Sequence, residues 1–121
     1  ERALDTVGLS AAAGAPAGTL SHGAQRQLEI AMSLATSPQV LLLDEPLAGM
    51  GHDESQSMIR LLGRLAPDHA MLLVEHDMDA VFALAQVLTV MVDGRVLESG
   101  DPATVRASPD VQRAYLGSGH G

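Results

Sequence analysis

The stretch Val40-Leu41-Leu42-Leu43-Asp44-Glu45-Pro46 decides the fold of this chain. An apolar run this short, ended by polar residues, is typical of a strand buried on both faces of a mainly parallel sheet. Asp44 and Glu45 then lie at its carboxyl end, which is the edge where open α/β sheets bind ligands. Adjacent carboxylates repel each other and resist desolvation, so they favour a bound cation. We therefore expect this edge to hold Mg²⁺ together with a nucleoside triphosphate.

Two helices are predicted before this strand. Residues 2–7 can form a short one, and Ser21 can cap a longer one that ends near Ala35. In the longer helix, apolar side chains recur with the spacing of one helix face, so we expect that face to be buried. Its expected members are Leu28, Ala31, Met32 and Ala35.

Helix and strand continue to alternate after Pro46. Asp53 and Asp77 are positioned to cap two further helices, and residues 70–75 form the predicted strand between them. The first of these helices repeats the spacing of a buried face, with Met58, Leu61, Leu62 and Leu65 as its members.

The last part of the chain predicts a hairpin followed by two short helices. Asp93-Gly94 is a typical two-residue turn, and it lies between expected strands over residues 87–92 and 95–98. Asp101-Pro102 and Ser108-Pro109 each place a capping residue before a proline, as at the start of a helix. The whole order of elements predicts an α/β fold.

Composition narrows the possible functions. The 121 residues are 46% hydrophobic, which is enough for a core, and no apolar stretch is long enough to span a bilayer. A net charge of -8 and an aromatic content of 2% argue against nucleic acid as a partner. The absence of cysteine excludes disulfides and thiolate metal sites. All 7 Lys and Arg residues are arginine, so this chain holds no Walker A loop, which requires a lysine.

Four motifs in fixed order resemble the ATPase domain of ATP-binding cassette (ABC) proteins. Residues 20–25 (Leu-Ser-His-Gly-Ala-Gln) resemble the signature motif, and residues 40–46 resemble Walker B. Leu47-Ala48-Gly49-Met50 resembles the D-loop, and His76 resembles the switch histidine. The resemblance covers nearly the whole chain. It implies a P-loop NTPase-like fold, a mainly parallel sheet flanked by helices, that is incomplete because the Walker A half is absent.

The same resemblance implies a division of the chain, residues 1–121 being the C-terminal portion of one ABC ATPase domain. Residues 1–37 would hold part of the helical signature subdomain. Residues 38–100 would hold the core from Walker B to the switch histidine, and residues 101–121 the tail.

The resemblance also implies three roles at the predicted strand edge. Asp44 would hold Mg²⁺, Glu45 would polarise the attacking water, and His76 would bind the γ-phosphate of ATP. Each alone has an ordinary alternative: a helix cap, a solvated carboxylate, or a structural histidine. Their occurrence together in the family's pattern favours the catalytic interpretation.

A second set of residues is implied to bind ATP held by an opposite subunit, namely Ser21, Gly23, Gln25 and Gly49. A serine-capped helix start offers free backbone N–H groups to an anion, and a glycine allows close approach of a phosphate. The alternative is an ordinary capped helix. His22 and Ala24 depart from the family's commoner glycine and glutamine, and the D-loop lacks the aspartate of many relatives.

The tail, residues 109–117, looks like that of ATPases serving branched-chain amino acid importers. This resemblance implies an ATP-hydrolysing importer subunit, paired head to tail with a second ATPase subunit, same or paralogous. It would lie in the cytoplasm at the inner face of the membrane through permease subunits. Without Walker A, this chain alone is expected to be inactive. Two alternatives remain: a soluble ABC ATPase acting on ribosomes or DNA, and a non-catalytic interaction fragment.

Overall fold

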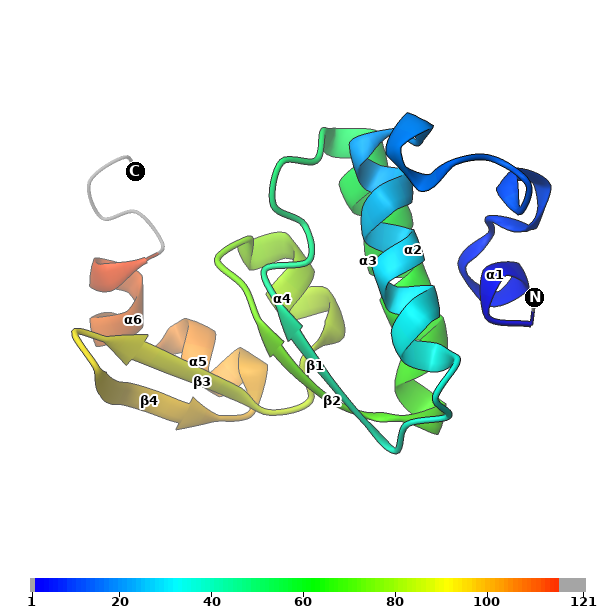
Figure 1. The fold of residues 1–121 in the computed structure, drawn as a ribbon. Helices are drawn as coiled ribbons and strands as arrows, with labels where there is room; N and C mark the ends of the chain where they lie inside the picture. The colour runs from blue at the N-terminus through cyan, green and yellow to red at the C-terminus, as the bar shows by residue number, and fades with distance from the viewer. Residues whose placement is uncertain (1, 116–121) are drawn as a thin grey trace. The chain divides into compact units, whose positions relative to one another are not determined.

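The computed structural model describes residues 2–115 (Figure 1), and the chain forms two compact units, residues 1–80 and 81–121. The first unit is mainly helical around one parallel strand pair. In chain order it contains α1 (Arg2–Val7), η1 (Ser10–Ala12), η2 (Ala17–Thr19), α2 (His22–Leu34), β1 (Val40–Asp44), α3 (His52–Leu65), η3 (Ala66–Asp68) and β2 (Ala70–Val74).

The second unit is built on an antiparallel hairpin. Its elements are the later part of α4 (Met78–Leu84), then β3 (Leu88–Val92), β4 (Arg95–Gly100), α5 (Pro102–Ala107) and α6 (Pro109–Ala114). The predicted order of helices and strands is therefore confirmed over residues 2–115, with shifts of one or two residues at element ends.

β1 and β2 pair in parallel, with Val40 opposite Ala70 and Asp44 opposite Val74. The carboxyl ends of both strands consequently lie at one edge. Solvent exposure alternates along the pair: Leu41 is buried, whereas Leu42 is 73% exposed and Leu72 is 61% exposed. The expectation of a strand buried on both faces is thus wrong for residues 2–115, because no described element covers the second face.

Helix α2 begins at Ser21 as expected, since the Ser21 hydroxyl accepts a hydrogen bond from the Ala24 N–H at 3.1 Å. The expected buried face is wrong in part: Met32 is 65% exposed and Ala35 is exposed. Ala31 is buried and Leu28 is half-buried as expected, and the covered side of the helix also includes Ile30, which is buried, and Leu34, which is half-buried. An apolar-rich helix offers two overlapping stripes, and the packing selected the one that includes Ile30.

Helix α3 carries the buried face that the sequence predicts, formed by Met58, Leu61, Leu62 and Leu65. Its start differs from the prediction. Gly51, not Asp53, is the N-cap, and the Glu54 carboxylate accepts a bond from the Gly51 N–H at 3.5 Å. A Glu at the third helical position reaching back to the cap is a recognised way to begin a helix, and it leaves Asp53 in the first turn.

The hairpin turns at Asp93-Gly94, where φ is +51° and +78°. Two successive positive φ angles match the right-handed twist of the strands, which explains the Asp-Gly pair. Asp101 caps α5 by accepting from the Thr104 N–H at 3.3 Å. The Tyr115 hydroxyl donates to the Met91 carbonyl, and the expected tail residues Leu116 and Gly117 lie outside the described residues.

No helix within residues 2–115 has the length and apolar character needed to cross a membrane.

Candidate functional site

The carboxyl edge of the β1–β2 pair brings two of the predicted site residues into contact. The Glu45 N–H donates to the carbonyl of Val74, the last residue of β2, at 2.7 Å, which extends the strand pairing one residue past β1. His76 follows β2, and its Nδ1 lies 2.5 Å from Glu45 Oε1. Both side chains reach solvent, His76 at 75% and Glu45 at 45% exposure. The parallel register therefore places a carboxylate and an imidazole within hydrogen-bond distance at an accessible edge.

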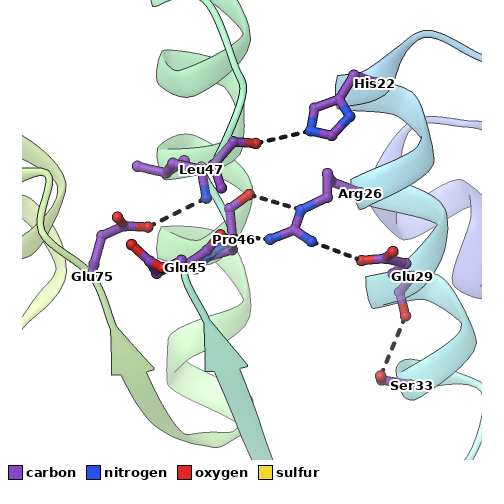
Figure 2. Close-up of polar contacts among 9 residues, drawn as sticks. His22, Arg26, Glu29, Ser33, Glu45, Pro46, Leu47 and Glu75 are labelled. Atoms are coloured by element: carbon purple, nitrogen blue, oxygen red, sulfur yellow. Dashed lines mark hydrogen bonds and ion pairs between the residues drawn. The ribbon is translucent and has the colours of Figure 1, made fainter.

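Glu75 is a member of this edge that was not predicted from the sequence. Its side chain is 2% exposed, and it accepts a bond from the Leu47 N–H at 3.3 Å (Figure 2). It also accepts a bond from the His76 N–H at 3.0 Å. Its Oε1 also lies 3.9 Å from His76 Nδ1. The available signal was positional, because Glu75 follows β2 as Glu45 follows β1. Through its bond to the Leu47 N–H, Glu75 connects the start of the D-loop to the end of β2.

The donor set at this edge fits a hard cation. Oxygen or nitrogen ligand atoms of Glu45, Glu75 and His76 lie within 4.8 Å of one another. Asp44 comes directly before them and is exposed, and within residues 2–115 its carboxylate has no hydrogen-bond or ion-pair partner. Mg²⁺ prefers one or two carboxylates and retains water, so an accessible strand-end carboxylate such as Asp44 suits it.

The start of α2 is already engaged by a carboxylate. Glu54 Oε2 accepts from the Gly23 N–H at 3.0 Å, so α3 supplies an anion to the N-terminus of the signature helix. A Cβ on residue 23 would lie 2.1 Å from that oxygen, so any larger residue there would have to displace the Glu54 carboxylate. The sequence analysis did not identify Glu54 as part of this region. Its position three residues after Gly51 was the signal that could have found it.

Ser21 and Gly23 line one surface pocket with Asp53 and Glu54. Gln25 does not extend into this group, because its amide donates to the carbonyls of Ala17 at 3.4 Å and Leu20 at 3.3 Å. Two of the four residues expected to bind ATP in trans, Ser21 and Gly23, therefore lie together in a pocket that also carries acidic side chains.

Gly49 lies in the D-loop turn with φ of +78°. A Cβ there would be 2.9 Å from His22 Nε2, and that nitrogen is 2.8 Å from the Ala48 carbonyl oxygen. Both the turn and the close approach of the imidazole thus require a glycine. His22, an unusual residue in the signature motif, connects α2 to the D-loop.

Arg26 makes a second connection from α2, as Figure 2 shows. Its Nη2 donates to the Glu45 carbonyl at 2.5 Å and its Nε to the Pro46 carbonyl at 3.4 Å. Nothing in the sequence pattern distinguished Arg26 from the other arginines. Side chains of α2 therefore connect this helix to the D-loop and to the end of β1 through contacts with backbone carbonyls.

Two family models match the chain. Residues 1–48 match the model described as ABC transporter, and residues 95–121 match the model described as branched-chain amino acid ATP-binding cassette transporter.

Curated relatives match over most of the chain. The high-affinity branched-chain amino acid transport ATP-binding protein BraF of Pseudomonas aeruginosa is 41% identical over 116 residues, covering 94% of this chain and 46% of BraF. The high-affinity branched-chain amino acid transport ATP-binding protein LivG of Escherichia coli is 40% identical over 94% of this chain and 46% of LivG. The chain thus spans about half the length of these relatives.

Solved structures agree in fold. The ATP-binding cassette MJ1267 of an ABC transporter superposes with a TM-score of 0.84 at 29% identity, covering 96% of this chain and 48% of MJ1267. CbiO1 from Clostridium perfringens, part of the transporter complex cbiONQ, gives a TM-score of 0.81 at 31% identity over 93% of this chain and 46% of cbiO1. Together with the ordered motifs and the strand-edge geometry above, these matches identify the chain as a fragment similar to the ATP-binding proteins of ABC transporters, in particular to those of branched-chain amino acid transport.

Proposed function

We propose that this chain is the C-terminal portion, from the signature motif to the tail, of an ATPase subunit that powers import of branched-chain amino acids. The observation that carries the proposal is the 2.5 Å contact of His76 with Glu45 at the carboxyl edge of β1 and β2. The similarity to BraF and LivG over 94% of the chain supports the substrate class.

In this proposal each residue of the edge has one task. Glu45 accepts a hydrogen bond from the attacking water and orients it toward the γ-phosphate, while His76 donates to a phosphate oxygen. Phosphoryl transfer needs little covalent help, so orientation and charge neutralisation provide most of the acceleration. Asp44 would hold Mg²⁺, which neutralises phosphate charge when bound. Glu75, buried beneath the pair, fixes the backbone that carries His76.

The proposal also includes partners and location. A second ATPase subunit would present ATP to Ser21 and Gly23, and Gln25 and Gly49 would support this contact from the signature helix and the D-loop. Permease subunits would hold the pair at the cytoplasmic face of the membrane. The nearby acidic residue Glu54 makes this contact conditional, because a phosphate must displace its carboxylate from the Gly23 N–H.

The test requires a protein that contains this chain together with a Walker A segment: the natural gene product or a fusion to the first half of E. coli LivG. We refer to it as the Walker A-containing protein. Glu45→Gln keeps the size of the side chain but removes the basic oxygen. We expect kcat for ATP hydrolysis to fall about 1,000-fold, while ATP binding persists.

Near-normal hydrolysis by Glu45→Gln would remove Glu45 from this role. The 121-residue chain alone is the matched reference, since it contains no lysine and thus no Walker A loop. It should neither hydrolyse ATP nor bind it with micromolar affinity. Micromolar binding measured by calorimetry would show that this chain can bind ATP without a Walker A loop, and would contradict the proposal.

A further inference from the structure

The backbone of Glu45 is in an unfavourable conformation. Its φ is +47°, in the left-handed region that is strained for a non-glycine residue. The next residue is Pro46, whose ring pushes a preceding residue toward extended conformations instead. Something in the surrounding structure must therefore hold this peptide in place.

Two hydrogen bonds hold it, one on each side of the residue. The Glu45 N–H donates to the Val74 carbonyl at 2.7 Å, and the Glu45 carbonyl accepts from Arg26 Nη2 at 2.5 Å. The first bond continues the strand pairing. The second comes from a different element, α2, and it is charge-assisted and hence stronger than a bond between neutral groups.

The guanidinium also reaches the Pro46 carbonyl at 3.4 Å, so one planar group contacts two successive carbonyl oxygens. The side chain of Arg26 is only 25% exposed. Its remaining contact, to Glu29 Oε2 at 3.4 Å, is with a carboxylate that is 64% exposed, and such surface pairs contribute little. The carbonyl contacts are thus the main interactions of this arginine.

We propose that Arg26 is a positioning residue: it holds the Glu45 peptide in its left-handed conformation and thereby directs the Glu45 carboxylate toward His76. Arg26 lies one turn into α2, the helix that begins with Ser21 and Gly23. A displacement of α2 when an anion binds its N-terminus is transmitted by the guanidinium to the Walker B carboxylate. This inference rests on the proposed function, because the positioning matters only if Glu45 acts on water.

A structural role for Arg26 would reduce stability and leave the kinetics of the folded enzyme unchanged. A positioning role lowers kcat without changing ATP affinity. Arg26→Met in the Walker A-containing protein keeps much of the stem and removes all donors. We expect kcat to fall about 10-fold, as when supporting partners of site residues are lost, and KM for ATP to stay within about 2-fold.

Two further variants complete the test. Glu29→Gln removes the surface partner of Arg26 but leaves both carbonyl bonds, and it should hydrolyse ATP at the wild-type rate. Arg26→Lys keeps the charge but lacks the planar, rigid fork that spans the two carbonyls, so its kcat should fall between those of wild type and Arg26→Met. If Arg26→Met does not fold, Arg26→Lys alone decides, and a wild-type kcat for it overturns the proposal.

The outcomes separate this inference from the proposed function. Active wild type, inactive Glu45→Gln and fully active Arg26→Met would overturn only the role of Arg26. An inactive wild type, or an active Glu45→Gln, would instead contradict the proposed function itself. Loss of stability in Arg26→Met with unchanged kcat would assign Arg26 a purely structural role.

Discussion

The two strand pairs of this protein differ in chain direction and, as a consequence, in which residues meet at their edges. β1 and β2 run parallel, so the residues after both strands meet at one edge, and His76 contacts Glu45 there. β3 and β4 run antiparallel, so the end of one strand lies beside the start of the other. The relative direction of two paired strands therefore decides where the polar groups that follow them converge.

The β3–β4 hairpin, by contrast, is held by a short turn and by contacts between residues close in sequence. Its turn has positive φ at both Asp93 and Gly94, and the Thr89 and Ser99 hydroxyls lie 2.8 Å apart across the strands. The parallel pair has no such local closure, because α3 separates its two strands in sequence. We therefore expect substitutions at the parallel edge to change catalysis, and substitutions in the hairpin turn to change stability alone.

After Glu45→Gln, the largest effect should come from His76→Ala in the Walker A-containing protein. Removal of a donor to the phosphate should lower kcat about 100-fold, the usual loss when one preorganised donor is removed. The measurement is steady-state ATP hydrolysis at saturating ATP. His52→Ala is the control, because His52 is an exposed residue at the start of α3. A kcat within 2-fold of wild type for His76→Ala would remove the parallel edge from the reaction.

A smaller effect is expected in the hairpin. Gly94→Ala places a side chain at φ +78°, where no atom lies within 4 Å of the new Cβ, so the cost comes from the backbone alone. Urea denaturation should show a loss of about 1 kcal/mol. Gly14→Ala, also without neighbours and without positive φ, is the matched control. Hydrolysis should be unchanged in both, and a fall in kcat for Gly94→Ala would break the distinction between the two pairs.

The smallest effect concerns the N-terminus of α2. Glu54→Gln keeps a group that can cap α3 but removes the charge that competes with a phosphate at the Gly23 N–H. ATP-dependent dimerisation of the Walker A-containing protein should need about 3-fold less ATP. Asp53→Asn makes the same charge change in the same pocket, with no bond to Gly23 within the described residues, and should have less effect. Equal shifts for both variants would show that Glu54 acts only through its negative charge and not through its bond to the Gly23 N–H.

The sequence was sufficient for the elements and for the convergence of Glu45 with His76, because strand ends and parallel order follow from short apolar runs. It was not sufficient for the burial of those elements. Met32 and Leu42 are apolar yet exposed, and a periodic pattern cannot tell which of two stripes meets a neighbour. The cap of α3 was misplaced for a related reason, since Asp53 and Gly51 both suit a helix start.

The supporting residues of the site were the hardest to find. Arg26, Glu54 and Glu75 act through backbone groups of distant segments: their partners lie 19, 31 and 28 residues away along the chain. A carbonyl or an N–H leaves no trace in a sequence motif, because every residue has one. Such contacts depend on the tertiary arrangement of helices around the strand edge, which local spacing does not encode.

The left-handed conformation of Glu45 has an evolutionary consequence. Asparagine and glycine tolerate that conformation better than glutamate does, so selection for folding stability alone would replace Glu45 with one of them. A glutamate at such a position is expected if residue 45 serves activity at a cost in stability, as proposed above. Consensus-based stabilisation of this protein should therefore leave residue 45 untouched and seek its gains elsewhere.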